Sequence, residues 1–219
     1  MDETQPTIFV IDDDAAVRKS LQRLLRAHKY QAETFVSAEE YLTRDQYEGL
    51  GAIILDLSLP GLNGIDLQTR LLEAGSQLPI IFLTGHGDIE TSVIAIKHGA
   101  ENFLTKPVNE NKLLSALQEA LSHHTEILKN QLDTQIIKQH LDSLTPREHE
   151  ILRYVISGAL NKQIAQQLDI AEKTVKVHRG RVLEKMQAGS VAGLVRMCSA
   201  VDVQPAEVPR SQKQLAAET

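Results

Sequence analysis

Residues 7–14 read TIFVIDDD, and this stretch decides the fold. Five residues without a charged interruption indicate a strand buried on both faces, which is typical of a parallel sheet covered by helices. Three aspartates follow the strand at once, and apolar residues recur at helical spacing over 17–28. The stretch therefore predicts a strand, a loop that carries carboxylates, and a helix.

The same alternation continues along the first half of the chain. Further strands are expected over 32–35, 52–55, 79–83 and 101–104, and helices over 65–72 and 89–96. Five β-α units in about 120 residues predict an α/β domain, a doubly wound five-stranded parallel sheet.

Length and composition favour a globular chain of one or two domains. The chain has 219 residues, 42% of them hydrophobic and 24% charged, which is ordinary globular usage. Its single cysteine, Cys198, excludes an internal disulfide framework. No apolar run approaches the ~18 residues of a membrane span, and the acidic start differs from a signal peptide. We expect a soluble, cytoplasmic protein without membrane contact.

Charge is distributed unevenly. Residues 1–125 carry 10 Lys and Arg against 18 Asp and Glu, whereas residues 126–219 carry 13 against 11. This asymmetry favours two domains with different partners, the second a polyanion. Of the eight Phe and Tyr residues, only Tyr154 lies beyond residue 125. Stacking of single-stranded bases by the second half is therefore not expected.

The second half is predicted to be helical up to about residue 201. Residues 112–141 lack Pro and Gly and predict one long helix or two in series, which either packs on its own domain or pairs with a second copy. Thr145-Pro146 then indicates a new helix start, and shorter helices are expected over 161–168, 172–186 and 190–198. The expected domains are 1–123, a helical linker at 124–143, a helical domain at 144–201, and a disordered tail at 202–219.

Polar residues follow four of the five expected strands. Asp12 and Asp13 end the first, Asp56 the third, Thr84 the fourth and Lys106 the fifth. Ligands of doubly wound sheets bind beyond the carboxyl ends of the strands, so these side chains are expected to converge. Adjacent carboxylates favour Mg²⁺, a lone lysine favours phosphate oxygens, and a central carboxylate is able to carry an acyl phosphate.

Other phosphate chemistries fit less well. The chain has neither a G-x-x-x-x-G-K-[ST] loop nor G-x-G-x-x-G after a strand. Three aspartates do not suit the phosphate end of a flavin mononucleotide site. Haloacid-dehalogenase-type phosphatases use Asp-x-Asp on the first strand, whereas Asp56-Leu57-Ser58 lies on the third.

These residues resemble the receiver domain of two-component response regulators over about 6–122. The residues that carry the resemblance are Asp12-Asp13, Asp56, Thr84, Phe103 and Lys106-Pro107. It implies a flavodoxin-like strand order and a cis peptide at Lys106-Pro107.

The resemblance also assigns roles. Asp56 would accept phosphate from a sensor histidine kinase or a small phosphodonor. Asp13, Asp56 and the Ser58 carbonyl would bind Mg²⁺, with Asp12 reaching it through water. Lys106 would pair with the phosphoryl oxygens, and Thr84 and Phe103 would act as the switch. Ser58 and His86 occupy positions that modulate phosphate lifetime.

The expected helix over 172–186 is basic. It carries Lys173, Lys176, Arg179, Arg181 and Lys185 against two glutamates. A solvated amphipathic helix is the plain interpretation of such a segment alone. A short helix and a tight turn at 169–171 precede it, however, and this arrangement is a helix-turn-helix whose second helix enters the major groove.

Residues 144–201 resemble the LuxR-type helix-turn-helix of FixJ/NarL response regulators, closest to the FixJ branch. The motifs are LTPRE at 144–148, NKQIA at 161–165 and KTVKVH at 173–178. The resemblance implies binding of double-stranded DNA. Base contacts would come from Lys176, Val177 and Gly180, and phosphate contacts from Lys173, Thr174, Arg179 and Arg181; His178 and Lys185 complete the expected interface.

Together these features predict a bacterial response regulator and transcription factor. Phosphorylation of Asp56 would change domain packing, favour a homodimer, and control binding to promoter DNA, with RNA polymerase as a further partner. No enzymatic activity is expected beyond weak self-phosphorylation and self-dephosphorylation. The alternatives are a receiver-based interaction adaptor and a slow aspartyl-phosphate phosphatase, both without DNA binding.

Overall fold

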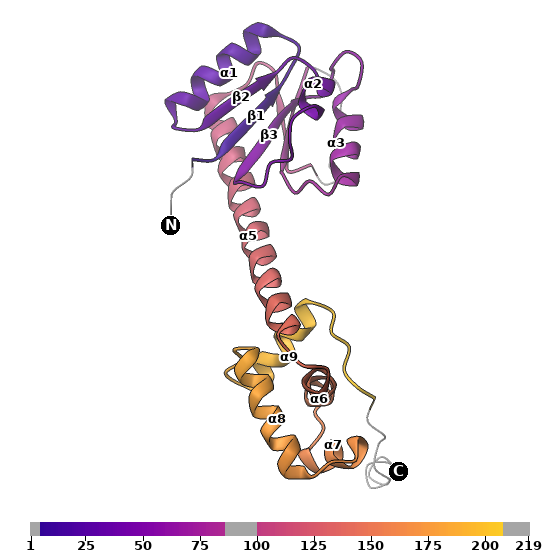
Figure 1. The fold of residues 1–219 in the computed structure, drawn as a ribbon. Helices are drawn as coiled ribbons and strands as arrows, with labels where there is room; N and C mark the ends of the chain where they lie inside the picture. The colour runs from indigo at the N-terminus through magenta and orange to yellow at the C-terminus, as the bar shows by residue number, and fades with distance from the viewer. Residues whose placement is uncertain (1–4, 86–99, 208–219) are drawn as a thin grey trace, which may run out of the picture. The chain divides into compact units, whose positions relative to one another are not determined.

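The computed structural model describes residues 5–85 and 100–207 (Figure 1). The chain divides into two compact units, residues 1–129 and residues 130–219. Within the described residues, none of the helices is long and apolar enough to cross a membrane.

The N-terminal unit contains a five-stranded parallel sheet in the order β2-β1-β3-β4-β5. The strands are β1 (Thr7–Ile11), β2 (Gln31–Phe35), β3 (Gly51–Asp56), β4 (Ile80–Thr84) and β5 (Asn102–Thr105). Every residue of β1, β3 and β4 is buried, and these segments are accordingly apolar except for Thr7, Asp56 and Thr84 at their ends. The predicted doubly wound α/β fold with flavodoxin-like strand order is confirmed.

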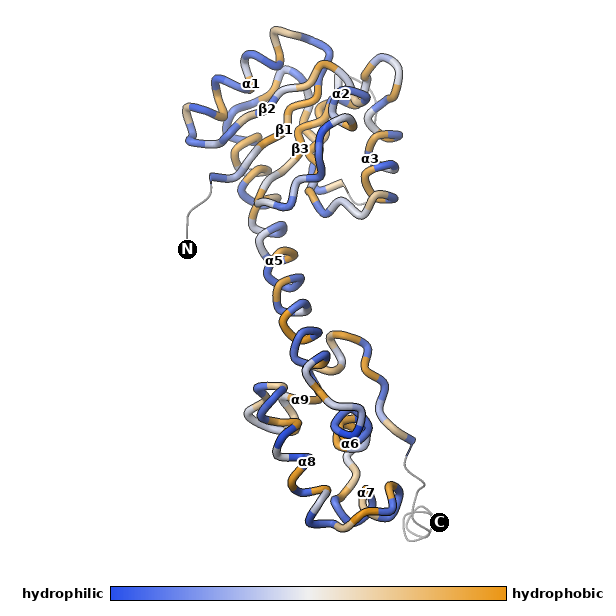
Figure 2. Tube along the Cα trace, in the orientation of Figure 1, coloured by the Kyte–Doolittle hydropathy of each residue, from blue (hydrophilic) through white to orange (hydrophobic). Residues whose placement is uncertain are grey.

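Helices cover both faces of this sheet (Figure 1). They are α1 (Ala15–Ala27), α2 (Ala38–Leu42), α3 (Gly64–Glu73) and the first part of α5 (Glu110–Asp142). Side chains alternate between the faces along a strand. Ile8 and Val10 therefore pack with apolar residues of α1 and α5, while Phe9 and Ile11 pack with α2 and α3. Figure 2 shows the matching pattern, with hydrophobic colour along β1 and β3 and mixed colour around the helices.

The expected elements occur with two qualifications. The short helix α2 was not expected, although Ser37 caps it and Glu40 stands at the third helical position, a combination that indicates a helix start. The helix predicted over 89–96, and His86, lie outside the described residues. Between the last strand and the second unit, the predicted helical segment is a single helix, α5.

Besides the last turns of α5, the C-terminal unit packs four helices around one apolar core. They are α6 (Pro146–Ile156), α7 (Asn161–Leu168), α8 (Glu172–Lys185) and α9 (Val191–Ala200), and Ile151, Val175, Val182 and Leu194 are buried among them. The helix starts at Thr145-Pro146 and Ser190 are confirmed, since both cap residues accept hydrogen bonds from the first turn. The tight turn after α7 is also confirmed, with Asp169 in the left-handed region at φ 49°.

The tail prediction is wrong for residues 202–207. Val203 N donates to Cys198 O at 3.0 Å, and Ala206 N donates to Arg153 O at 2.9 Å. Arg153 Nε in turn donates to Gln204 O at 3.0 Å. These bonds and the contact of Val203 with the core fix the segment on α6 and α9. Residues 208–219 lie outside the described part of the chain.

Candidate functional site

The carboxyl ends of the strands bring the predicted acidic residues together. Ile11 of β1 pairs with Leu55 of β3, so the residues that follow them, Asp12 and Asp56, stand side by side at the edge of the sheet. Both are buried. The sequence forms this arrangement because each strand stays apolar up to its last position and only then presents a carboxylate.

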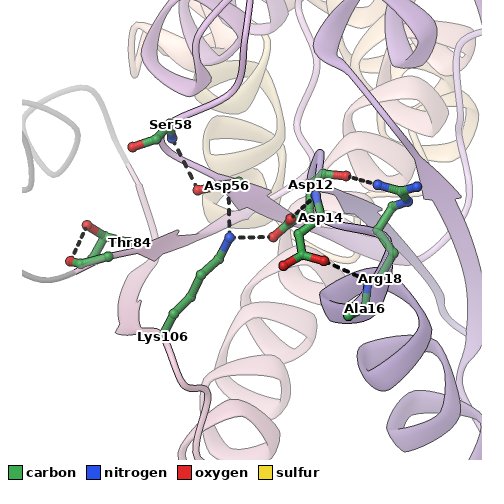
Figure 3. Close-up of polar contacts among 9 residues, drawn as sticks. Asp12, Asp14, Ala16, Arg18, Asp56, Ser58, Thr84 and Lys106 are labelled. Carbon is green, nitrogen blue, oxygen red and sulfur yellow. Dashed lines mark hydrogen bonds and ion pairs between the residues drawn. The ribbon is translucent and has the colours of Figure 1, made fainter.

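Lys106 joins the two buried carboxylates. Its Nζ lies 2.7 Å from Asp12 Oδ2 and 2.8 Å from Asp56 Oδ2 (Figure 3). Lys106 N also donates to Thr84 O at 2.8 Å, and the Lys106-Pro107 peptide is cis, as expected. Burial opposes the ammonium charge, but the ion pairs with Asp12 and Asp56 outweigh it and raise the pKa of Lys106.

Asp13 completes a group of three carboxylates, which we call the acidic cluster: Asp12, Asp13 and Asp56. One ligand oxygen from each lies within 4.8 Å of the others. Burial raises the pKa of Asp12 in spite of its bond to Lys106, because desolvation is the largest influence on that carboxyl group. Among the described residues, these three carboxylates form ion pairs with Lys106 alone, so their negative charge exceeds the positive charge of their partner. Their oxygens are the ligands that Mg²⁺ prefers, so these residues fit that ion.

Hydrogen bonds hold the two loops that carry the cluster (Figure 3). Asp14 N donates to Asp12 Oδ1 at 2.9 Å, and Asp14 caps α1 by accepting from Ala16 N at 2.7 Å. Ser58 N donates to Asp56 Oδ1 at 3.1 Å. Arg18 Nη1 donates to the Asp12 carbonyl at 2.5 Å. The carboxylates of Asp12 and Asp56 are thus oriented before any ligand arrives.

The two predicted switch residues, Thr84 and Phe103, do not take part in the hydrogen bonds of the acidic cluster. Thr84 is buried at the end of β4, but its hydroxyl donates to Gly85 O at 3.0 Å and is not turned toward Lys106 (Figure 3). Phe103 is half-buried and stacks on Phe82, with ring centroids 5.0 Å apart. The structure therefore brings Asp12, Asp13, Asp56 and Lys106 together and leaves the Thr84 hydroxyl outside their hydrogen bonds.

Helix α8 presents most of the predicted DNA contacts to solvent. The exposed members of the predicted set are Lys173, Thr174, Lys176, Val177, Gly180 and Arg181. The buried Val175 and Val182 mark the opposite side, which packs on the core. A helix with exposed cations and a buried apolar side is suited to lie on a polyanion.

Two further cations of the predicted DNA interface, Arg179 and Lys185, make contacts inside the C-terminal unit. Arg179 Nη1 donates to Asn161 Oδ1 at 3.1 Å. Lys185 Nζ pairs with Glu148 Oε2 at 2.7 Å and donates to Ser143 O at 3.1 Å. His178 is half-buried and its Nδ1 is enclosed.

Sequence reasoning missed the roles of Glu148 and Arg18. Glu148 is buried at the start of α6, accepts from Thr145 N at 2.9 Å, and carries the ion pair with Lys185. The bond from Lys185 and the bond from Thr145 N lower the pKa of Glu148 to about 2. The capping pattern Thr145-x-x-Glu148 was a visible signal for the second bond. Arg18 gave no signal, because nothing in its spacing indicates which way a long side chain turns.

Both halves of the chain match known families. Residues 8–118 match the family described as response regulator receiver domain, and residues 142–198 match the luxR family of bacterial regulatory proteins.

Similar proteins align over most of the chain. Response regulator protein TodT of Pseudomonas putida is 42% identical over 197 residues, which cover 90% of this chain and 87% of TodT. Transcriptional regulatory protein FixJ of Bradyrhizobium diazoefficiens is 39% identical over 196 residues, covering 89% and 95%. The solved structure of response regulator StyR superposes with a TM-score of 0.79 at 41% identity and covers 90% of this chain and 99% of StyR.

Proposed function

The chain belongs to the LuxR/FixJ family of transcriptional response regulators, and from that premise we propose that Asp56 is its phosphoacceptor and that α8 is its DNA-recognition helix. The receiver would occupy residues 1–123, the linker 124–143 and the DNA-binding domain 144–201. Its partners would be a sensor histidine kinase and double-stranded promoter DNA in the cytoplasm. The observation that carries the proposal is the ammonium of Lys106 between Asp12 and Asp56, beside the exposed carboxylate of Asp13.

In the proposed transfer, a carboxylate oxygen of Asp56 attacks the phosphorus of a phosphohistidine. The new O–P bond forms as the P–N bond breaks, and the donor imidazole leaves with the electron pair and takes up a proton. Asp56 is 5% exposed, so attack requires the donor to approach from the open edge of the sheet. Lys106, already 2.8 Å from Asp56 Oδ2, is placed to pair with a phosphoryl oxygen there.

Asp12, Asp13, Asp56 and the carbonyl of Ser58 would hold Mg²⁺. The ion would neutralise the clustered carboxylates and the oxygens of the incoming phosphoryl group. Asp13 is the exposed member of the cluster, and Asp12 is the buried one whose carboxylate Lys106 already contacts. The chain's own groups thus divide the work, with the acidic cluster for the cation and Lys106 for the phosphate.

The switch would begin at Thr84. Its hydroxyl now donates to Gly85 O, and turning toward a phosphoryl group on Asp56 would break that bond. Phe103, stacked on Phe82 at the neighbouring strand, would respond to the space that Thr84 leaves. We propose that this change favours a homodimer and exposes the DNA-binding surface, and that RNA polymerase is a further partner. Slow loss of the phosphate through self-dephosphorylation would reset the chain.

Labelling with radioactive acetyl phosphate in the presence of Mg²⁺ tests the phosphoacceptor. Wild type should incorporate label, and Asp56→Asn should incorporate none. Asp45→Asn makes the same change at an exposed aspartate and should label like wild type. Equal labelling of Asp56→Asn and wild type would contradict the assignment.

Duplex binding tests the second half of the proposal. Wild type phosphorylated with acetyl phosphate should bind promoter fragments more tightly than Asp56→Asn treated in the same way. Absence of a salt-sensitive affinity for the duplex would instead favour an adaptor that does not bind DNA, because contacts to phosphates release counterions and make binding salt-dependent.

A further inference from the structure

Arg18 stands on the second turn of α1, next to the acidic cluster but outside it. Its Nη1 donates to the carbonyl oxygen of Asp12 at 2.5 Å (Figure 3). That carbonyl is part of the peptide bond that joins Asp12 to Asp13. The side chain is half-buried, whereas Arg23 and Arg26 of the same helix are exposed. The guanidinium is therefore directed back to the end of β1.

Each polar group of Asp12 has a hydrogen-bond or ion-pair partner. Its N–H donates to Phe35 O, its Oδ1 accepts from Asp14 N, its Oδ2 pairs with Lys106, and its carbonyl accepts from Arg18. Such a residue has one backbone orientation. Of these four bonds, only the one from Arg18 acts on the peptide plane that leads into Asp13.

Asp13 has no such support of its own. Its carboxylate is exposed, and in the part of the chain that the structure describes no hydrogen bond or ion pair holds it. The direction in which it presents its oxygens to the cluster therefore depends on the backbone at the Asp12-Asp13 peptide. A carboxylate that must meet two others within 4.8 Å loses this geometry when the peptide before it rotates.

We propose that Arg18 is a positioning residue for the cation site: by fixing the Asp12-Asp13 peptide it directs Asp13 toward the ion that Asp12 and Asp56 share. The inference rests on the proposed function, since it takes the acidic cluster as a divalent-cation site. Groups that orient metal ligands without touching the metal tune affinity in many proteins.

Electrostatics alone predicts the opposite effect. A guanidinium near a cation site repels the cation, so loss of its charge should strengthen binding. A positioning role predicts weaker binding after the same change. The sign of the effect therefore separates the two explanations, and a variant that removes an equal charge elsewhere on α1 provides the reference.

The test is titration of the full-length chain with Mn²⁺, with free Mn²⁺ measured by electron paramagnetic resonance and Mg²⁺ added as competitor. Arg18→Gln should weaken Mn²⁺ affinity about tenfold. Arg23→Gln should stay within about twofold of wild type, because it removes the same charge from an exposed side chain with no part in the site. Arg18→Lys keeps a donor of the same charge and should recover part of the loss.

Unchanged or stronger Mn²⁺ binding by Arg18→Gln would overturn the proposal. Thermal unfolding without metal serves as the folding control, and if Arg18→Gln melts early, the comparison of Arg18→Lys with wild type decides in its place. Asp13→Asn tests the cation site itself, separately from the role of Arg18. If wild type binds no Mn²⁺, or Asp13→Asn binds it as well as wild type, the cation site itself is wrong and the role of Arg18 falls with it.

Discussion

Packing inside the C-terminal unit gives no reason for a glycine at position 180. It is exposed in the middle of α8, a Cβ added there would meet no atom within 4 Å, and its φ is not positive. Glycine in a helix interior costs about 1 kcal/mol relative to alanine. A residue that destabilises its helix without a packing reason suggests a reason outside the chain. If α8 is the recognition helix proposed above, close approach of its backbone to DNA would be that reason.

Gly180→Ala should therefore raise the free energy of unfolding of the C-terminal unit by about 1 kcal/mol. Urea denaturation of the full chain measures the gain. If the glycine serves close approach, the more stable variant should bind duplex DNA less tightly than wild type. Equal or tighter binding would show that Gly180 is only a gap in the row of side chains.

The residue type and the position of Lys185 leave two roles open. Its charge and its place on α8 suggest a phosphate contact, but its ammonium lies 2.7 Å from the buried Glu148. An ammonium already paired inside the domain has few donors left for DNA. Lys176 is exposed on the same helix and provides a matched comparison.

Lys176→Gln should flatten the dependence of log K on log salt by about 0.9, as expected for one lost phosphate contact. Lys185→Gln should leave that slope as in wild type and instead lower the stability of the domain. Fluorescence anisotropy with a labelled random-sequence duplex at several salt concentrations measures both slopes. A slope for Lys185→Gln as flat as that for Lys176→Gln would restore Lys185 to the DNA interface.

At the scale of elements, the pair Glu148–Lys185 connects the start of α6 to the end of α8. Lys185 and Thr145 N hold the pKa of Glu148 at about 2, below its ordinary value of 4.5. A carboxyl group with a lowered folded pKa stabilises the fold fully above its unfolded pKa, and this contribution is lost as the pH falls through the folded pKa.

Glu148→Gln should cost about 1–2 kcal/mol at neutral pH, since glutamine keeps an acceptor for Thr145 N but loses the charged bond to Lys185. The difference from wild type should be constant above pH 4.5 and shrink as the pH falls toward about 2. Hydrogen exchange of the α6 and α8 amides at a series of pH values measures this difference in stability between the variant and wild type. A difference that does not change between pH 5 and pH 3 would contradict the ion-pair explanation.

Elements with strong local patterns were predictable from the sequence, and elements held by side-chain contacts were not. The buried strands β1, β3 and β4 are apolar at nearly every position, and the capped starts of α6 and α9 carry their signals within four residues. Residues 202–207 look like a disordered tail, yet their backbone bonds to Arg153 and Cys198 hold them in place. The bond to Cys198 is local to the end of α9, but the bonds to Arg153 join residues more than 50 positions apart and have no local pattern.

In the candidate site, too, the positions of residues were predictable from the sequence, but the directions of their side chains were not. Asp12, Asp56, Thr84 and Lys106 could be placed because the ends of parallel strands meet at one edge. The direction of the Thr84 hydroxyl, the reach of Arg18 and the inward turn of Lys185 depend on rotamers that only the packed structure selects.

At the scale of the whole molecule, two units of different charge share one chain. The acidic N-terminal unit carries the phosphoacceptor candidate, and the C-terminal unit carries the exposed cations of α8. One such unit would provide a single recognition helix, the proposed α8, which would reach only a few base pairs. Proteins of this kind gain affinity and specificity by binding two half-sites as dimers. A signal that controls dimerisation therefore controls DNA occupancy without changing any base contact.

Phosphorylation should accordingly double the mass of the particle in solution. Wild type treated with Mg²⁺ and acetyl phosphate should shift from monomer to dimer in light scattering on a sizing column, and Asp56→Asn should not shift. The reason is linkage: phosphorylation stabilises the conformation that is able to dimerise more than the resting conformation. The population of dimer therefore rises. Lys106→Met supplies a second control, because it keeps the Asp56 acceptor but removes the cation that would pair with the phosphoryl oxygens. It should take up label and shift less than wild type. A dimer of the same mass in every variant, before and after treatment, would show that phosphate controls DNA binding by another route.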